Sequence, residues 1–258
     1  MEDLSNYRKS YEKSQLLEDN IPEDPINLFH KWFYETQEFG GVDEVNAMTV
    51  ATIGLDGFPK SRVVLLKKFN EEGFIFYTNY NSEKGKAIQN NPNICLSFFW
   101  HSMERQVIIK GIAEKTSGTI SDNYFSSRPD GSKLGAIVSP QSEVIPSRHY
   151  LDNKLRELES AYEGKEILRP DFWGGFLVRP IEVEFWQGRP NRLHDRIRYQ
   201  IQDNFSWKID KRWTVPNIGK LELLYLETQL STQQQEHNFR EYSPIINRCK
   251  CTVINSVW

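Results

Sequence analysis

The chain has 258 residues, with 32 Lys and Arg against 35 Asp and Glu, so its formal net charge is −3. Hydrophobic residues make up 38% and aromatic residues 13% of the sequence, which is enough apolar surface for a core and excludes wholesale disorder. The near-neutral charge argues against bulk nucleic-acid binding, and no apolar run approaches the ~20 residues of a membrane-spanning helix. Three cysteines without zinc-finger spacing, and five histidines without ligand spacing, predict no metal site and a reducing, cytoplasmic setting.

The first predicted elements are a polar N-terminal arm, residues 1–25, and a helix over residues 26–39. Asp24 can cap this helix, in which apolar residues recur at near-helical spacing. Short β-rich runs follow at 47–53, 61–67, 74–78, 94–100 and 106–113, separated by turn signals such as Asp56-Gly57. A short helix capped by Ser82 interrupts them. This regular spacing of hairpin-linked strands predicts an antiparallel barrel or sandwich.

The middle of the chain is predicted to be helical, over residues 117–127, 131–138 and 147–163. Strands are predicted again at 174–178, 181–187, 196–201 and 205–209. The expected fold class is mostly β with flanking helices (α+β), in one domain over residues 26–212. Residues 213–258 show no strand or turn pattern that links them to this domain, so they are predicted to be an extension and a candidate for disorder.

Four clusters hold cations and hydroxyls where strands and turns would present them. The first is the run from Arg62 to Lys67, whose end charges are predicted on opposite faces because side chains alternate along a strand. An edge strand with protective charges explains that run equally well. The second is Tyr77-Thr78 followed by Ser82 to Lys86, which predicts a phosphate cradle at a helix N-terminus. Solvated surface lysines are the commoner explanation of that pattern.

The third cluster is Tyr124, Arg128 and Ser132, which are spaced by four residues and suit a phosphate dianion. The fourth cluster runs from Trp186 to Arg196. If this run is a strand, Arg192, His194 and Arg196 share one face, which is costly unless an anionic or polarised ligand lies between them. A binding role is therefore favoured for the fourth cluster, because Asp195 is its one local acidic partner.

These clusters, in this order, resemble the pyridoxine (pyridoxamine) 5′-phosphate oxidases, the FMN enzymes that form pyridoxal 5′-phosphate. The similarity is continuous from about Arg8 to Arg212 and includes Asn46-Ala47-Met48, Ser127-Arg128-Pro129, Trp173-Gly174-Gly175 and the highly specific run from Arg192 to Ile197. The resemblance implies an antiparallel, FMN-binding split barrel. It also implies a homodimer, with FMN bound in clefts at the subunit interface.

The resemblance further implies two sets of site residues. FMN would be held by Arg62, Val63, Val64, Leu65, Tyr77, Thr78, Lys84, Gln106, Gln141, Ser142, Trp186 and Arg196. The substrate would be held by Lys67, Tyr124, Arg128, Ser132, Arg192, Leu193 and His194, with Arg192 and His194 closest to the reacting carbon. The implied reaction oxidises pyridoxine or pyridoxamine 5′-phosphate to pyridoxal 5′-phosphate. Dioxygen is the acceptor, and hydrogen peroxide, with ammonia from the amine, is released.

Two features depart from the family pattern. Glu83 precedes Lys84 where the family usually has two adjacent basic residues, and the sequence after Trp213 does not match the family's ending. Two other interpretations stay open: a non-catalytic split-barrel protein that binds FMN or pyridoxal phosphate and is impaired by its C-terminus, and a related flavoprotein with another substrate. The phosphate-binding types in the third cluster disfavour the latter. Arg8 and Tyr11 of the arm are further candidate contacts.

Overall fold

The computed structural model describes residues 1–211, in which there are nine strands and five α-helices. The strands are β1 Ala47–Ile53, β2 Pro59–Leu65, β3 Lys68–Asn70, β4 Gly73–Asn79, β5 Asn93–Trp100, β6 Arg105–Lys115, β7 Trp173–Gln187, β8 Asp195–Ile201 and β9 Trp207–Lys211. The helices are α1 Pro25–Phe39, α2 Glu83–Asn90, α3 Gly118–Ser126, α4 Asp130–Val138 and α5 Arg148–Ala161, with 3-10 turns η1 Glu18–Asn20 and η2 Pro190–Arg192. The predicted extension, residues 213–258, lies outside the described residues.

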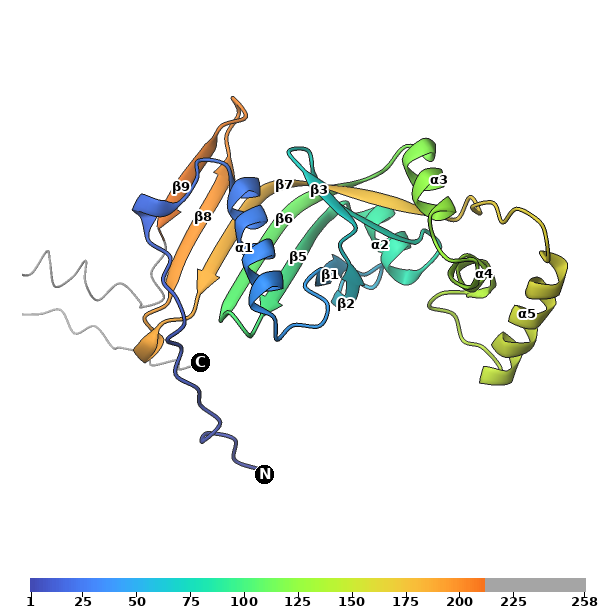
Figure 1. Cartoon of the computed structure of the whole chain (residues 1–258), viewed down its shortest axis with the longest axis horizontal. Helices are drawn as coiled ribbons and strands as arrows, with labels where there is room; N and C mark the ends of the chain where they lie inside the picture. Colours follow the sequence, from blue (N-terminus) through green and yellow to red (C-terminus); the bar gives the residue numbers. More distant parts are fainter. Residues whose placement is uncertain (212–258) are drawn as a thin grey trace, which may run out of the picture. The chain divides into compact units, whose positions relative to one another are not determined.

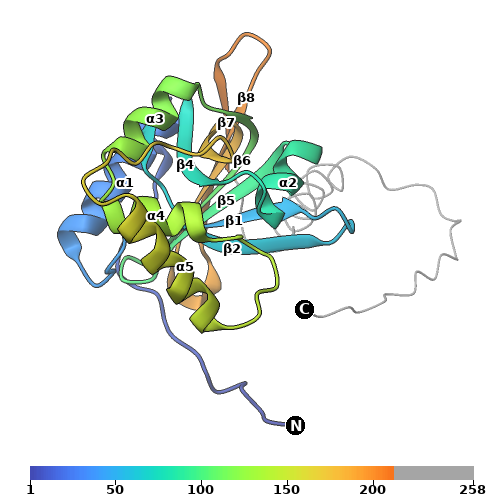
Figure 2. The same cartoon turned by 90° about the vertical axis from the view of Figure 1, so that its right-hand side faces the viewer.

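The strands form one antiparallel sheet in the order β2-β1-β5-β6-β7-β4-β3, and β8 and β9 extend it from the second half of β7. Figures 1 and 2 show α3, α4 and α5 gathered beyond the start of β7, while β8 and β9 lie at its other end. The curled antiparallel sheet with flanking helices confirms the predicted fold class. Among the strands that the structure describes, β2 pairs with β1 alone, so its second edge is open to them.

The predicted helix caps are confirmed by the structure. The Asp24 carboxylate accepts the N–H of Ile26 at 2.7 Å, and the Ser82 hydroxyl accepts the N–H of Gly85 at 3.2 Å. The Ser147 hydroxyl accepts the N–H of Tyr150 in the same way at the start of α5. Each cap satisfies an N–H that the helix itself leaves open and contributes about 1 kcal/mol.

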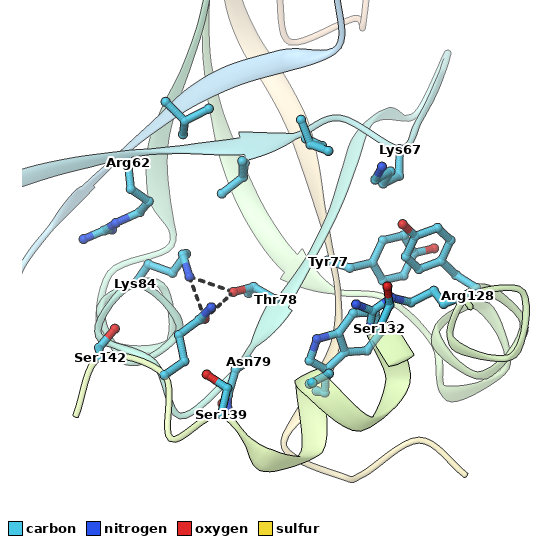
Figure 3. Close-up of a pocket in the computed structure, with 18 of the residues that line it drawn as sticks. Arg62, Lys67, Tyr77, Thr78, Asn79, Lys84, Arg128, Ser132, Ser139 and Ser142 are labelled. Carbon is cyan, nitrogen blue, oxygen red and sulfur yellow. Dashed lines mark hydrogen bonds between the residues drawn. The ribbon is translucent and has the colours of Figure 1, made fainter. Parts of the chain in front are cut away.

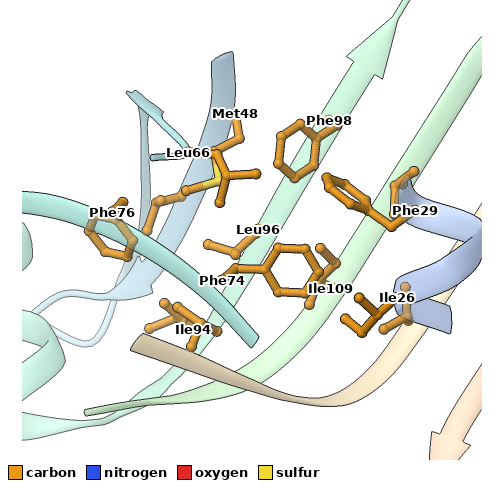
Figure 4. Packing of buried hydrophobic residues seen from close by; sticks show 14 of the residues in the cluster. Ile26, Phe29, Met48, Leu66, Phe74, Phe76, Ile94, Leu96, Phe98 and Ile109 are labelled. Atoms are coloured by element: carbon orange, nitrogen blue, oxygen red, sulfur yellow. The ribbon is translucent and has the colours of Figure 1, made fainter. Parts of the chain in front are cut away.

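The core lies between α1 and the concave side of the sheet (Figure 4). Alternate residues of the strands are buried on this side, among them Met48, Val50, Leu96, Phe98, Val107, Ile109, Val183 and Phe185. Phe29 of α1 packs edge-on against Phe74 and Phe98, with ring centroids 5.0 and 5.1 Å apart. The helix therefore covers the core face of the sheet.

One predicted break in the sheet is wrong, because residues 173–187 form a single strand rather than two. Pro180 lies between the two predicted strands and has no N–H to give to a ladder. In the structure Pro180 lies opposite Gly111, where the register of β6 shifts between Lys110 and Gly111. A bulge tolerates the missing donor, so β7 runs through it without interruption.

Among the described residues, no helix is both long enough and apolar enough to cross a membrane. In the same part of the chain, His, Cys, Asp and Glu side chains form no group of three or more that could hold a metal ion.

Candidate active site

A cavity of about 920 Å³ opens between the free edge of β2, the end of β4, the start of α2 and the turn from α3 into α4. It brings together most of the predicted site residues, namely Arg62, Val63, Val64, Leu65, Lys67, Tyr77, Thr78, Lys84, Tyr124, Arg128, Ser132, Gln141 and Ser142. Figure 3 shows Arg62 and Lys84 on one side of the cavity and Lys67, Arg128 and Ser132 on the other. The cavity thus has two cationic ends.

At the first end, the Lys84 side chain is buried, since only 7% of the residue is exposed. Its ammonium group donates to Thr78 Oγ1 at 2.9 Å and to Gln141 Oε1 at 2.8 Å. Burial, with the charge of Arg62 adding to it, lowers the pKa of Lys84 to about 8. No ion pair with a carboxylate compensates this charge within residues 1–211. A buried cation held only by neutral groups is suited to an anionic ligand.

Glu83, the departure from the family pattern, lies beside this end but does not line the cavity. Its carboxylate bonds to the Lys60 ammonium, and its Oε2 lies 3.8 Å from Nη2 of Arg62. Nη1 of Arg62 donates to Thr52 Oγ1 at 3.0 Å. Lys60 and Arg62 of β2 therefore neutralise the carboxylate of Glu83. The guanidinium of Arg62 also faces the cavity, so Glu83 competes with a bound ligand for it.

At the second end, aromatic rings form a stack that supports Arg128. The rings of Tyr77 and Tyr124 are 3.8 Å apart and nearly parallel, and Trp173 continues the stack. The Arg128 guanidinium lies 4.7 Å from the centroid of Trp173. Burial raises the pKa of both phenols, so they remain protonated donors at neutral pH. Sequence reasoning gave Trp173 no site role, because its contacts come from three separate elements.

Within residues 1–211, two polar atoms at this end are buried without a hydrogen-bond partner, the Tyr77 hydroxyl and Nη1 of Arg128. A buried donor left open costs about 1–3 kcal/mol, so these groups indicate a ligand with acceptor oxygens. Together with Lys84 they provide donors for two anionic groups, one at each end of the cavity. This donor set fits the two phosphates that the sequence analysis leads us to expect, on FMN and on the substrate.

The predicted placement of Arg62 and Lys67 on opposite faces is wrong. Strand β2 ends at Leu65, and the N–H of Lys67 instead bonds to the carbonyl of Ile75 on β4 at 2.9 Å. Alternation stops where the strand stops, and the chain turns so that both side chains line the same cavity.

The remaining predicted residues do not line this cavity; they are Gln106, Trp186, Arg192, Leu193, His194 and Arg196. Gln106, Trp186 and Arg196 lie directly opposite one another on β6, β7 and β8. This second group is at the far end of β7 from Trp173, which lines the cavity. At ~3.3 Å per residue, the separation along the strand is roughly 40 Å. The predicted site residues therefore form two separate groups in one chain, which we call the first and second half-sites.

Arg192, His194 and Arg196 do not share a strand face, which corrects the prediction. Strand β8 begins only at Asp195, and Arg192 belongs to η2, in which it and Asn191 have φ of 61° and 57°. The backbone N–H of Arg189 donates to Nδ1 of His194 at 3.1 Å, so the neutral ring carries its proton on Nε2. Burial lowers the pKa of His194, and the charges of Arg196 and Arg192 lower it further.

Comparison with known proteins gives concordant matches. Residues 35–161 match the family described as pyridoxamine 5′-phosphate oxidase, and residues 173–214 match the pyridoxine 5′-phosphate oxidase C-terminal dimerisation region. A pyridoxine/pyridoxamine 5′-phosphate oxidase of Flavobacterium johnsoniae is 77% identical over 211 residues, covering 82% of this chain and 99% of the relative. The corresponding oxidase of Christiangramia forsetii is 54% identical over 209 residues, covering 81% and 97%.

Solved structures share the fold. The structure of PhzG from Burkholderia lata, in complex with tetrahydrophenazine-1-carboxylic acid, aligns with a TM-score of 0.70 and 29% identity, covering 76% of this chain and 95% of that one. A pyridoxamine 5′-phosphate oxidase-related, FMN-binding protein from Nostoc punctiforme aligns with a TM-score of 0.58 and 15% identity, covering 74% and 99%.

Proposed function

The chain belongs to the pyridoxine/pyridoxamine 5′-phosphate oxidase family, and from this premise we propose that each of its active sites is assembled from two copies of the chain. It is an FMN-dependent oxidase that converts pyridoxine or pyridoxamine 5′-phosphate to pyridoxal 5′-phosphate, with dioxygen as acceptor. We assign this activity to residues 26–212 and place the enzyme in the cytoplasm.

The observation that carries the composite site is the separation of the half-sites along β7. Trp173 and Trp186 belong to one continuous strand, so the two ends cannot fold onto each other within a subunit. In a dimer with a two-fold axis, the first half-site of each copy would lie against the second half-site of the other. Such a dimer would therefore contain two complete sites. The match of residues 173–214 to a dimerisation region supports the same arrangement.

An exposed sheet face supports the dimer as well. Cross-strand pairs link Val63 to Thr49, Thr49 to Ser97, Ser97 to Ile108 and Ile108 to Glu184, so these residues share one face. Phe99, Gln106 and Trp186 lie two residues further along the same strands and point the same way. Val63 is 69% exposed and Phe99 is 56% exposed in the isolated chain. This face, opposite the core, offers apolar area that a second copy would bury.

Lys84, Arg62 and Thr78 would hold the phosphate of FMN in this cavity, and Val63, Val64 and Leu65 of β2 would contact the rest of the cofactor. Bound there, FMN supplies the hydride acceptor for the substrate carbon that is oxidised. The ammonium of Lys84 and the guanidinium of Arg62 would neutralise the cofactor phosphate. Gln141 and Thr78, which already accept from Lys84, orient that ammonium.

The substrate phosphate would lie on Lys67, Arg128 and Ser132, far from the reacting carbon. Binding energy gained there serves to orient the carbon–hydrogen bond that breaks. The half-site of the second copy would supply Arg192 and His194, whose Nδ1 accepts the N–H of Arg189 and whose Nε2 carries the proton of the neutral ring. These groups would bind the polar edge of the pyridine ring and fix its tilt.

The activity is tested with the full chain loaded with FMN. Mixed with pyridoxine 5′-phosphate in air, it is expected to form hydrogen peroxide and the aldehyde product in equal amounts. A coupled peroxidase assay measures the peroxide, and absorbance measures the aldehyde. A protein that binds FMN and forms no peroxide would instead be the non-catalytic binding protein. The donors around Arg128 favour a phosphorylated substrate, so unphosphorylated pyridoxine is expected to react far more slowly.

The composite site is tested by subunit complementation. Arg128→Met damages the first half-site and Arg192→Met the second, so each homodimer is expected to be nearly inactive. A heterodimer of the two variants, co-expressed with different affinity tags, has one site with both halves intact and is expected to show about half of the wild-type activity. If the heterodimer is as inactive as the two parents, each site is built within one chain.

A further inference from the structure

Residues 9–16 of the N-terminal arm run across the second half-site. The ring of Tyr11 packs edge-on against both Trp186 and His194, with centroids 5.6 Å apart in each pair. A Cβ atom at Gly188 would lie 2.7 Å from Cγ of Tyr11, so a side chain at residue 188 would displace the ring. Tyr11 is thus seated in a close-fitting place above two proposed site residues.

The arm is held there by the carboxylate of Glu104, in the turn between β5 and β6. This side chain is only 2% exposed. Oε2 accepts the backbone N–H groups of Glu12 at 2.8 Å and Lys13 at 3.1 Å, while Oε1 lies 3.1 Å from the Lys9 ammonium. Burial acts to raise the pKa of Glu104, but the N–H groups and Lys9 outweigh it and hold that pKa below its ordinary value. The carboxylate is therefore charged at neutral pH.

The backbone of Glu104 is part of the same arrangement. It has a φ of 56°, in the left-handed region that a non-glycine residue avoids, and its carbonyl accepts the N–H of Gly188 at 2.7 Å. The side chain of Gln187 also donates to this carbonyl at 3.2 Å. Glu104 therefore joins the arm to the end of β7, where Trp186 lies.

A second set of contacts fixes the far end of the arm. Oδ2 of Asp195 accepts the N–H of Leu16 at 2.9 Å, and Nη1 of Arg189 donates to the side chain of Gln15 at 3.2 Å. Asp195 and Arg189 bracket the loop that carries Arg192 and His194. The arm and this loop are consequently held as one piece.

We propose that Glu104 is a positioning residue for substrate binding: it pins the backbone of Glu12 and Lys13 so that Tyr11 covers the Trp186–His194 half-site. The inference rests on the proposed function in so far as that half-site binds the substrate ring. With the arm pinned, Tyr11 shields the bound ring from water and slows its escape. With the arm released, the substrate phosphate is still held by the first half-site, so affinity weakens while the chemical step is unchanged.

The test is Glu104→Gln, which keeps the shape of the side chain and removes its charge. Hydrogen bonds to a charged acceptor are the stronger kind, so we expect roughly fivefold to tenfold higher KM for pyridoxine 5′-phosphate, with kcat within about twofold. Trypsin cleavage after Lys9 and Lys13 in the full-length, FMN-loaded protein is expected to accelerate by at least about tenfold. The matched control is Glu35→Gln, whose carboxylate pairs with Arg105 at 2.6 Å rather than with the arm, and which should change neither readout.

Tyr11→Ala completes the experiment. If Glu104 acts through Tyr11, this variant raises KM by itself but adds little in the Glu104→Gln background. The proposal is overturned if Glu104→Gln leaves trypsin cleavage unchanged, if cleavage accelerates without a change in KM, or if the two KM effects multiply in full. Proteolysis does not depend on turnover, so a chain without oxidase activity would overturn the proposed function and still leave the anchoring role of Glu104 measurable.

Discussion

Arg128→Met is expected to lower kcat/KM for pyridoxine 5′-phosphate by roughly 100- to 1000-fold, mainly through KM. Arg128 is held over Trp173 with one buried Nη1 atom that has no hydrogen-bond partner in the isolated chain. A guanidinium that gains two charge-assisted hydrogen bonds to a phosphate contributes about 3–4 kcal/mol, which corresponds to that loss at about 1.4 kcal/mol per factor of ten. Steady-state oxidation rates over a range of substrate concentrations measure it.

Two further variants make this result specific. Arg128→Lys should recover about tenfold of the loss, because an ammonium keeps the charge but cannot form two parallel bonds. Lys133→Met is the matched control on α4, since Lys133 pairs with Asp130 and does not line the cavity. FMN affinity should stay within about twofold of wild type in all three. An unchanged KM in Arg128→Met, or a parallel loss of FMN, would show that this end of the cavity does not bind the substrate phosphate.

Lys84→Met is expected to weaken FMN binding by roughly 100-fold. The ammonium of Lys84 is buried among neutral acceptors, and a phosphate would give it the counter-charge that the folded chain lacks there. Losing one buried, charge-assisted contact costs about 1.5–3 kcal/mol, and the nearby Arg62 remains. Quenching of flavin fluorescence on titration of the apoprotein measures the dissociation constant directly.

The same titration has a predicted pH dependence. In the ligand-free chain the pKa of Lys84 is lowered to about 8, whereas a bound phosphate would favour its charged form and raise that pKa. FMN affinity should therefore be constant below pH 8 and fall as the pH rises above it, because binding then requires uptake of a proton. Lys84→Met should abolish this fall, and a wild-type affinity that is flat from pH 7 to 10 would contradict it.

Glu83 and Lys86 provide the comparisons on the same helix. Removing the Glu83 charge frees Lys60 and Arg62, so Glu83→Gln should tighten FMN binding by about twofold to fivefold. The effect is smaller than for a buried ion pair, because these side chains are partly exposed. Lys86→Met changes a charge that does not line the main cavity and should leave the affinity unchanged. Equal losses in Lys84→Met and Lys86→Met would indicate general electrostatic attraction rather than a defined phosphate site.

Two kinds of sequence signal identify the predicted site residues: local chemistry and the family resemblance. Local chemistry singled out Lys84 at a helix N-terminus, Arg128 at a spacing that suits a phosphate, and the Arg192–Arg196 run, whose neighbouring cations are costly without a ligand. Gln106, Gln141 and Ser142 came only with the family resemblance, since a single glutamine or serine has no pattern that separates it from an ordinary surface residue. The structure places Gln141 against Lys84 and Gln106 opposite Trp186, at different half-sites.

The sequence by itself determined the helix caps at Asp24, Ser82 and Ser147 and the run of short, turn-linked strands that indicates the fold class. These depend on neighbours a few residues apart, and such interactions are local enough to be read along the chain. Only the tertiary structure decided that β7 continues through Pro180, that Lys67 lines the same cavity as Arg62, and that Arg192 precedes its strand. Each depends on where a distant strand pairs or ends, which the local sequence does not show. The pairing of β6 with β7 also keeps β7 a single strand, and this strand separates the two half-sites.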